Sequence, residues 1–179
     1  MHYLNNLRIL AEPAKEPQRL IPWLRHPHSL TDKLQSLKSS ISLQLLFQQW
    51  IKPTWWDKYV LSIEDEFIFQ REIIMESQHV AYWYARAIIP KSCYDLDQMF
   101  FKRLEKESIR NLIFDSQEVH RVDFIAYPVD KECIEFHWAN KHLSGVQGKL
   151  WVRFAEFSFQ NKASFYLLEI LSPELEGAS

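Results

Sequence analysis

The sequence predicts an antiparallel α+β domain, and three observations support this fold class. Runs with the alternation of β-strands recur along most of the chain and are joined by short turns. Two segments with helical spacing interrupt these runs. No repeat, low-complexity tract or linker divides the 179 residues, so we expect a single domain over residues 1–179.

The composition restricts the class of protein. An apolar fraction of 47% with 7 Trp is that of a folded domain with a sizeable core. The formal net charge of -2, with both signs mixed, gives no reason to expect nucleic acid or a membrane surface as a partner. The N-terminal stretch has no apolar run long enough for a signal peptide or a membrane span, and 2 Cys make no disulfide framework. We therefore expect a reduced cytoplasmic protein.

The first elements are an irregular lead-in over residues 1–20 and a helix over residues 30–37. Ser29 is a favourable N-cap residue, and Asp32 three positions later can act as the acidic partner of a capping box. The i, i+4, i+7 spacing then places three leucines on the buried face of the helix, namely Leu30, Leu34 and Leu37.

Most of the remaining chain reads as strands. The strand pair over residues 66–90 turns near Ser77-Gln78-His79, and the last two strands form a hairpin around Asn161-Lys162. Residues 95–113 change to helical spacing, and their Lys, Arg and Glu residues fit a solvated face. The predicted strands cover residues 41–51, 55–63, the pair within 66–90, 119–128, 134–140, 150–160 and 163–173.

Two isolated charges on apolar strand faces are the clearest indication of a functional site. Arg71 is the only charge in a row of large apolar side chains on one face of its strand, because side chains alternate across a strand. Glu169 repeats this pattern with the opposite sign near the other end of the chain. A buried guanidinium is costly unless an anion meets it. The two residues are either one structural ion pair or the two poles of a pocket, and periodicity alone slightly favours the pair.

Arg86 and Arg153 also lie in phase with large apolar residues. Several strand arginines in apolar surroundings suit a small carboxylate ligand, because a guanidinium can bind a carboxylate through two bonds. The structural alternative is an ion pair with Glu72 or Glu156. Taken singly, Arg86 and Arg153 are both assigned this structural role.

Other kinds of chemistry are not indicated by the sequence. With 3 Gly and no G-x-x-x-x-G-K or G-x-G-x-x-G motif, a glycine-rich phosphate loop is excluded. No nucleophile elbow of the G-x-S-x-G type is present. His26 and His28 are interpreted as loop histidines, because no other ligands accompany them at the spacing of a metal site. Cys93 and Cys133 lack a C-x-x-C spacing and are interpreted as inert thiols.

Four stretches within residues 23–173 follow one another in a recognisable order, and they read WLRHPHSLTDKL, REIIMESQHVAYWYARAIIP, SIRNLIFDSQEVHRVDFI and LWVRFAEFSFQNKASFYLLEILSP. Their order resembles that of the chorismate–pyruvate lyase family, bacterial enzymes that make 4-hydroxybenzoate for ubiquinone. The most specific elements are R-E-I-I followed by A-R-A-I-I-P, and the terminal L-L-E-I-L-S-P.

The resemblance implies a six-stranded antiparallel sheet with helices packed on it and an internal ligand cavity. It implies a carbon–oxygen lyase that eliminates pyruvate from chorismate to give 4-hydroxybenzoate, the first committed step of ubiquinone biosynthesis. It also implies that neither a metal nor an organic cofactor takes part. The expected partners are this small-molecule substrate and product, without nucleic acid or membrane, and the expected state is a monomer.

The resemblance also implies roles for four residues. Arg71 would hold the ring carboxylate, and Glu169 would face the oxygen at the far end of the ring. Leu30 and Ile109 occupy the places of two apolar residues that present their backbone to the ligand carboxylate. Leu30 replaces a methionine that is common in the family, and Asn161 stands in the last hairpin where glycine is common. That hairpin and the RVDF segment each carry one extra residue.

The chemistry of chorismate agrees with these implied roles. Loss of pyruvate makes the ring aromatic, so the reaction is downhill and needs little covalent help. Burial on an apolar strand should raise the pKa of Glu169, which could then donate a proton or a hydrogen bond to the ether oxygen. The sequence leaves open whether Glu169 transfers a proton or only positions the substrate for a concerted elimination.

Two alternatives to the enzyme remain at this point. Effector-binding domains of some transcription regulators have a similar fold and bind small acids without turnover. Such domains normally follow a winged DNA-binding domain, for which this chain is expected to have no room. In the other alternative, Arg71 and Glu169 form an ion pair that only stabilises a protein of another binding function.

Overall fold

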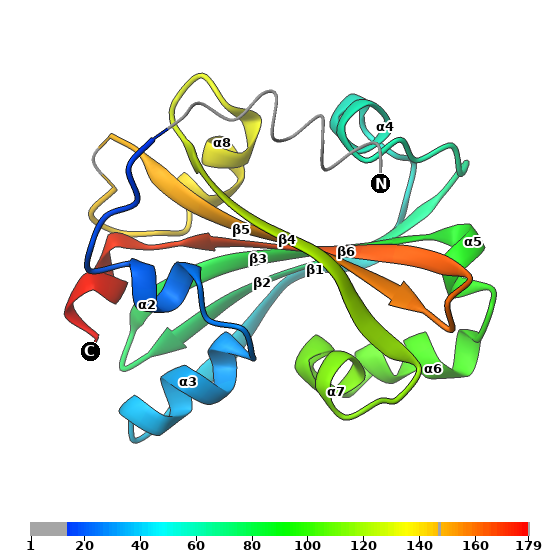
Figure 1. Cartoon of the computed structure of the whole chain (residues 1–179), viewed down its shortest axis with the longest axis horizontal. Helices are drawn as coiled ribbons and strands as arrows, with labels where there is room; N and C mark the ends of the chain where they lie inside the picture. The colour runs from blue at the N-terminus through cyan, green and yellow to red at the C-terminus, as the bar shows by residue number, and fades with distance from the viewer. Residues whose placement is uncertain (1–13, 147, 179) are drawn as a thin grey trace.

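A computed structural model describes residues 14–146 and 148–178, so part of the predicted lead-in lies outside the described residues. Its centre is a six-stranded antiparallel sheet with the strand order β1-β2-β3-β6-β5-β4 (Figure 1). The prediction of a single α+β domain is confirmed, as is the six-stranded sheet implied by the family resemblance. The strands are β1 (Ser42–Ile51), β2 (Ile68–Ser77), β3 (Val80–Pro90), β4 (Val119–Val129), β5 (Leu150–Phe159) and β6 (Ala163–Leu171).

Helices cover both faces of the sheet, which Figure 1 shows nearly edge-on. The face that lies below the sheet in this view carries α2 (Ile21–Leu24), α3 (Leu30–Leu37), α6 (Gln98–Lys102) and α7 (Ile109–Phe114). The opposite face carries α4 (Trp55–Val60) and α8 (Ile134–Asn140). Three short elements complete the described chain, namely α5 (Lys91–Tyr94), η1 (Arg103–Glu105) and η2 (Pro173–Gly177).

Two hairpins supply the four central strands, and both turn where the sequence predicted. The β2–β3 turn passes through Gln78 and His79, whose φ angles are 51° and 65°. The β5–β6 turn passes through Gln160 and Asn161, with φ angles of 53° and 57°. Asn is one of the few residues other than glycine that enters the left-handed region at low cost, which explains how Asn161 serves at this turn.

The apolar core is divided by the sheet. The face under α4 and α8 is packed with residues that include Trp56, Ile74, Tyr84, Phe154 and Leu168. On the other face the core has two parts. One lies around Trp23, Leu34 and Trp83, near α2 and α3, and the other lies around Phe101, Phe159 and Phe165, near α6 and α7. The division of this face leaves space for a pocket between the two parts.

Two segments predicted as strands are helices. Residues 55–60 form α4, because Thr54 and Asp57 make a reciprocal capping box. The Oγ1 of Thr54 accepts a hydrogen bond from the backbone N–H of Asp57 at 3.3 Å, and the carboxylate of Asp57 accepts one from the backbone N–H of Thr54 at 2.7 Å. Residues 134–140 form α8, whose buried residues Glu135, Phe136 and Ala139 follow helical spacing. The strand predictions over 55–63 and 134–140 are therefore wrong.

The helical segments differ from the prediction in detail. The Oγ of Ser29 caps α3 as predicted, accepting a hydrogen bond from the backbone N–H of Asp32 at 3.2 Å. Leu30 and Leu34 are buried, but Leu37 is 46% exposed, because it ends the helix beyond the reach of the core. The predicted helical segment over residues 95–113 is broken into α6, η1 and α7.

Candidate active site

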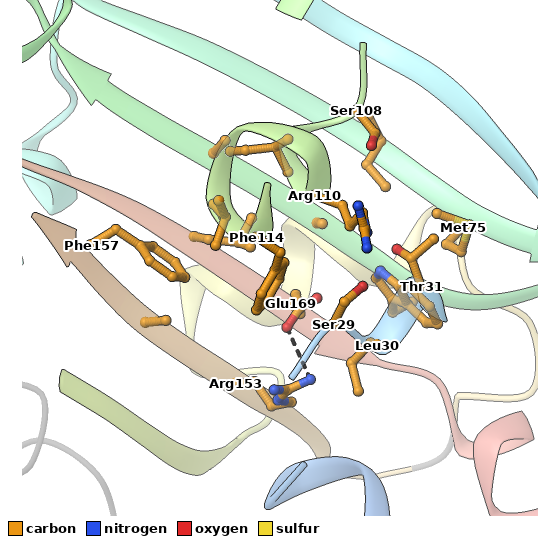
Figure 2. A pocket seen from close by; sticks show the side chains of 18 of the residues that line it. Ser29, Leu30, Thr31, Met75, Ser108, Arg110, Phe114, Arg153, Phe157 and Glu169 are labelled. Carbon is orange, nitrogen blue, oxygen red and sulfur yellow. Dashed lines mark ion pairs between the residues drawn. The ribbon is translucent and has the colours of Figure 1, made fainter. Parts of the chain in front are cut away.

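A pocket lies between the two parts of the divided core, and α3 and α7 border it (Figure 2). All six strands contribute side chains to it. Most of the lining is apolar, including Ile73, Met75, Trp83, Ala85, Phe157 and Leu167. The charged residues that line it are Arg71, Arg110, Arg121, Arg153 and Glu169.

Strand β2 carries Arg71 into the pocket, where its side chain is 8% exposed. Its Nη1 donates hydrogen bonds to the backbone oxygens of Leu104 and Glu107, the latter at 3.0 Å. Its Nε and Nη2 form no hydrogen bond with any residue that the structure describes. Burial lowers the pKa of Arg71, but a guanidinium starts so high that it stays charged. Arg71 is therefore a buried cation that two backbone carbonyls hold in position, and the Nε–Nη2 edge of its guanidinium remains available to an anion.

Strand β6 carries Glu169 into the same pocket, and β5 places Arg153 directly opposite it in the sheet register. The Nη1 of Arg153 lies 3.2 Å from the Oε2 of Glu169, the ion pair drawn as a dashed line in Figure 2. Burial raises the pKa of Glu169, while the guanidinium groups of Arg153 and Arg121 oppose this rise. Glu169 is thus a carboxyl group whose proton is held more tightly than usual.

Arg71 and Glu169 both line the pocket, and no ion pair joins them within the described chain. They stand on β2 and β6, which are separated by β3, so their strands run about 10 Å apart across the sheet. The structural pair that periodicity slightly favoured is therefore wrong. The placement agrees with the alternative interpretation, in which the two residues are the poles of a pocket.

Arg153 was assigned to a structural ion pair with Glu156, and this assignment is wrong. Glu156 points to the other face of the sheet, where its carboxylate accepts a hydrogen bond from the Oγ of Ser164 at 2.5 Å. The position of the hairpin turn sets which residues of β5 and β6 lie opposite each other. Arg153 is paired with Glu169 only when the turn is placed at the correct residues. The turn runs over residues 160–162 and includes the predicted Asn161-Lys162, but a two-residue turn at Asn161-Lys162 would shift the register by one and would not pair Arg153 with Glu169.

Arg86 does not line this pocket but lies on the opposite face of the sheet, beside Trp138 of α8. Its Nε is 4.0 Å from the carboxylate of Glu72, its Nη2 donates to Gln70, and its guanidinium lies 4.0 Å from the ring centroid of Trp138. The structural role predicted for Arg86 therefore agrees with its contacts.

Leu30 and Ile109 are the first residues of α3 and α7, and both line the pocket. The first N–H groups of a helix have no acceptor within the helix, so they are available to a ligand. The carbonyls of Leu104 and Glu107 that hold Arg71 come just before α7. The Arg71 guanidinium therefore lies beside the segment that leads into Ile109.

An ion pair joins the two helices that border the pocket. Arg110 on α7 donates to Asp32 on α3, with 2.9 Å between Nη2 and Oδ2, and also to Asp115 at 2.7 Å. Figure 2 shows Leu30, Arg110 and Phe114 among the side chains that line the pocket together with Glu169. The starts of α3 and α7 are thus held together at this site.

The sequence did not single out Arg110, Arg121 or Phe124, all of which line the pocket. Each of these residues has apolar neighbours in its own strand or helix. They meet only through contacts between segments that are distant in the sequence. Among the described residues no group of three or more His, Cys, Asp or Glu could hold a metal ion. Neither Cys93 nor Cys133 is in a disulfide within the described chain, and burial raises the pKa of Cys93 to about 12.

Comparison with known proteins agrees with the fold and with the motifs. A family model described as Chorismate lyase matches residues 12–173. A relative from Aromatoleum aromaticum named "Probable chorismate pyruvate-lyase" is 24% identical over 149 residues, which cover 74% of this chain and 80% of the relative. A relative of the same name from Idiomarina loihiensis is 25% identical over 138 residues, which cover 76% and 69%.

Several similar solved structures are transcriptional regulators, and this likeness shows the fold alone. A GntR-family regulator from Bacillus cereus has a TM-score of 0.54 at 12% identity, covering 75% of this chain and 92% of the regulator. PhnF from Mycobacterium smegmatis has a TM-score of 0.55 at 11% identity, covering 96% and 78%. No helix within residues 14–146 and 148–178 is long and apolar enough to cross a membrane.

Proposed function

This chain belongs to the chorismate lyase family, and we propose that it eliminates pyruvate from chorismate to give 4-hydroxybenzoate. One observation carries the proposal. A single apolar pocket holds a guanidinium with an available edge at Arg71 and a carboxyl group of raised pKa at Glu169. The enzyme would work without a metal or organic cofactor and would supply the first committed step of ubiquinone biosynthesis.

The Arg71 end of the pocket would hold the ring carboxylate. The Nε and Nη2 of Arg71 form an edge that matches the two oxygens of a carboxylate. The first backbone N–H groups of α3 and α7, at Leu30 and Ile109, would add donors to the same oxygens. Two contacts support this role for the N–H groups. Arg71 is hydrogen-bonded to the segment just before α7, and the Arg110–Asp32 ion pair holds the start of α3 next to the start of α7.

The Glu169 end would hold the reacting part of the ring. In the net reaction the bond from the ring to the ether oxygen breaks, and its electrons go to that oxygen. The hydroxyl-bearing ring carbon loses its hydrogen as a proton, the ring becomes aromatic, and the methylene carbon of the released enolpyruvate gains a proton. A protonated Glu169 can donate a hydrogen bond or a proton to the ether oxygen as charge develops there. The raised pKa of Glu169 supports this role, because it increases the protonated fraction.

The surroundings of the two charged ends supply the rest of the catalysis. The apolar lining keeps bulk water away, so the interactions of Arg71 and Glu169 with the substrate are stronger than they would be in water. Because aromatisation drives the reaction, the pocket needs to orient the ring and stabilise the polarised ether.

Incubation of the purified protein with chorismate in EDTA tests this function. We expect equimolar 4-hydroxybenzoate and pyruvate, identified by mass and by coupled reduction of pyruvate. Formation of 3-hydroxybenzoate would indicate a different chorismate-cleaving activity. Tight binding of 4-hydroxybenzoate without turnover of chorismate would indicate a ligand sensor, and activity that returns only on addition of a metal would contradict the cofactor-free reaction.

A further inference from the structure

The charges around the pocket do not balance. Arg110 is compensated by Asp32 and Asp115. The other cations are Arg71, Arg121 and Arg153, and Glu169 is the carboxylate that lines the pocket with them. Arg71 at one end and Arg121 at the Glu169 end are therefore the two lining cations that form no ion pair with a carboxylate of the described chain. A pocket of this kind suits a dianion whose two charges lie at separate positions.

The hydrogen-bonding capacity of Arg153, at the Glu169 end, is only partly used. Its side chain is buried, with 3% of the residue exposed. Its Nη2 donates to the backbone oxygen of His26 at 2.9 Å, and its Nη1 lies 3.2 Å from the Oε2 of Glu169 in an ion pair without hydrogen-bond geometry. Its Nε has no hydrogen-bond partner among the described residues. A buried donor without an acceptor costs free energy, so it points to a missing anion.

A shared aromatic ring holds a second guanidinium beside Arg153. The guanidinium carbons of Arg153 and Arg121 each lie 5.2 Å from the ring centroid of Phe124. Arg121 is more exposed than Arg153 and forms no ion pair with the described residues. Phe124 therefore keeps two cations next to a single carboxylate, Glu169.

We infer that Arg153, with Arg121 beside it, binds the second carboxylate of the substrate, the one on the enolpyruvyl group. This inference rests on the proposed function. In chorismate the ring carboxylate lies opposite the hydroxyl carbon, and the ether carbon is the neighbour of the hydroxyl carbon. A ring with its carboxylate at Arg71 and its hydroxyl at Glu169 places the ether substituent beside Glu169, where β5 carries Arg153.

This arrangement separates the substrate from its product. Chorismate has two carboxylates and would engage both ends of the pocket, whereas 4-hydroxybenzoate has one and would engage only the Arg71 end. The second carboxylate would also neutralise the cation that opposes the raised pKa of Glu169. Substrate binding would thereby favour the protonated form of Glu169 that the elimination uses.

The test compares two unreactive ligands by calorimetry. One is 4-hydroxybenzoate, and the other is 3-(carboxymethoxy)-4-hydroxybenzoate, which adds a second carboxylate through an ether at the same ring position. We expect the parent protein to bind the dicarboxylate about tenfold or more tightly than the monocarboxylate, the gain of one charge-assisted contact. Equal dissociation constants for the two ligands would overturn the inference. Failure to bind either ligand would contradict the proposed function as well.

Variants assign the preference to Arg153. The Glu169→Gln background avoids leaving a buried carboxylate unpaired when the arginine is removed. In this background Arg153→Met should reduce the preference for the dicarboxylate by about tenfold to a hundredfold, with the dissociation constant of 4-hydroxybenzoate nearly unchanged. Equal weakening of both ligands would assign Arg153 a structural role and overturn the inference.

Two further variants complete the design. Arg121→Met removes a more exposed cation that the fold should tolerate, and we expect a smaller loss of the same preference. An unchanged preference in both Arg121→Met and Arg153→Met would overturn the inference. Arg103→Met is the matched control, because Arg103 pairs with Glu107 on the surface outside the pocket lining. It should leave the ratio of the two dissociation constants as it is in the parent.

Discussion

At the scale of single residues, the guanidinium of Arg71 decides what the pocket can hold. Removing it with Arg71→Met should cost about 2–5 kcal/mol of 4-hydroxybenzoate binding, the range for losing one partner of a buried charge pair. Arg71→Lys should lose part of this binding, because an ammonium keeps the charge but not the two-bond edge. Calorimetry gives both values, and thermal melts check that the variants fold. A methionine variant that binds as tightly as the parent would place the carboxylate elsewhere.

The raised pKa of Glu169 has a consequence for stability against pH. Because the folded state holds this proton more tightly than the unfolded state, the stabilisation is present below the unfolded pKa and is lost as pH rises through the folded pKa. The parent should therefore lose stability relative to Glu169→Gln as pH increases from acid to neutral.

Urea unfolding of the parent and of Glu169→Gln across this pH range measures the difference directly. The variant also leaves Arg153 without its ion-pair partner, which changes the free energy of unfolding. Because a guanidinium stays charged throughout, this change is the same at every pH and does not affect the slope of the difference against pH. A difference that grows in the opposite direction would mean that Arg153 lowers the pKa of Glu169 more than burial raises it.

Single residues also show how far sequence reasoning can reach. Arg71 and Glu169 stand out because strand alternation leaves each as an isolated charge on an apolar face. Their separation could not be predicted, because it depends on β3 lying between β2 and β6. Arg153 could be assigned to its place opposite Glu169 only through the exact position of the turn at Gln160 and Asn161.

At the scale of elements, a helix or strand was predicted correctly where cap or turn residues close in the sequence determine it. Hairpins and α3 were predicted correctly because turn residues and the Ser29 cap act locally. The segment from Trp55 was mistaken for a strand because its aromatic and β-branched residues also suit strands, while the Thr54–Asp57 capping box selects the helix. In α8 the buried face is set by packing over the sheet, which the sequence does not display.

The contact between α3 and α7 gives a prediction about ligand release. Asp32 and Arg110 are partly exposed, so their ion pair should stabilise the fold by only about 0–1 kcal/mol. Because the pair joins two helices that border the pocket, Asp32→Asn should speed dissociation of 4-hydroxybenzoate with little change in melting temperature. Stopped-flow displacement measures the rate. Asp115→Asn is the control, because Asp115 contacts the same arginine from the end of α7 itself.

An unchanged dissociation rate in Asp32→Asn would show that the pair does not control the opening of the pocket. An equal increase in Asp115→Asn would assign the effect to the orientation of Arg110 and not to the link between α3 and α7. The two variants thus separate the link from the arginine that forms it.

At the scale of the whole molecule, the sheet separates stability from function. The face under α4 and α8 is a continuous core, which includes Tyr84 and Phe154 and lies away from the pocket. The other face divides its core into two parts and leaves the pocket between them. The fold class follows from the alternating runs, but the strand order and the division of the core arise from contacts between distant segments.

The fold alone does not identify the activity. Transcriptional regulators share this architecture at 12–16% identity, and the same scaffold can serve different sites. What distinguishes a lyase from a sensor is a residue whose loss stops turnover without removing the ligand. Glu169 is the residue to which our proposal assigns this property.

The kinetics of Glu169→Gln test the central claim most directly. The amide keeps the size and hydrogen-bonding capacity of the side chain but removes its ionisable proton. We expect kcat for chorismate to fall by about 10²–10⁴-fold, the usual contribution of general acid–base catalysis, while the dissociation constant of 4-hydroxybenzoate changes much less. Parent-like turnover in this variant, or a loss of ligand binding as large as the loss of turnover, would contradict the assignment of catalysis to Glu169.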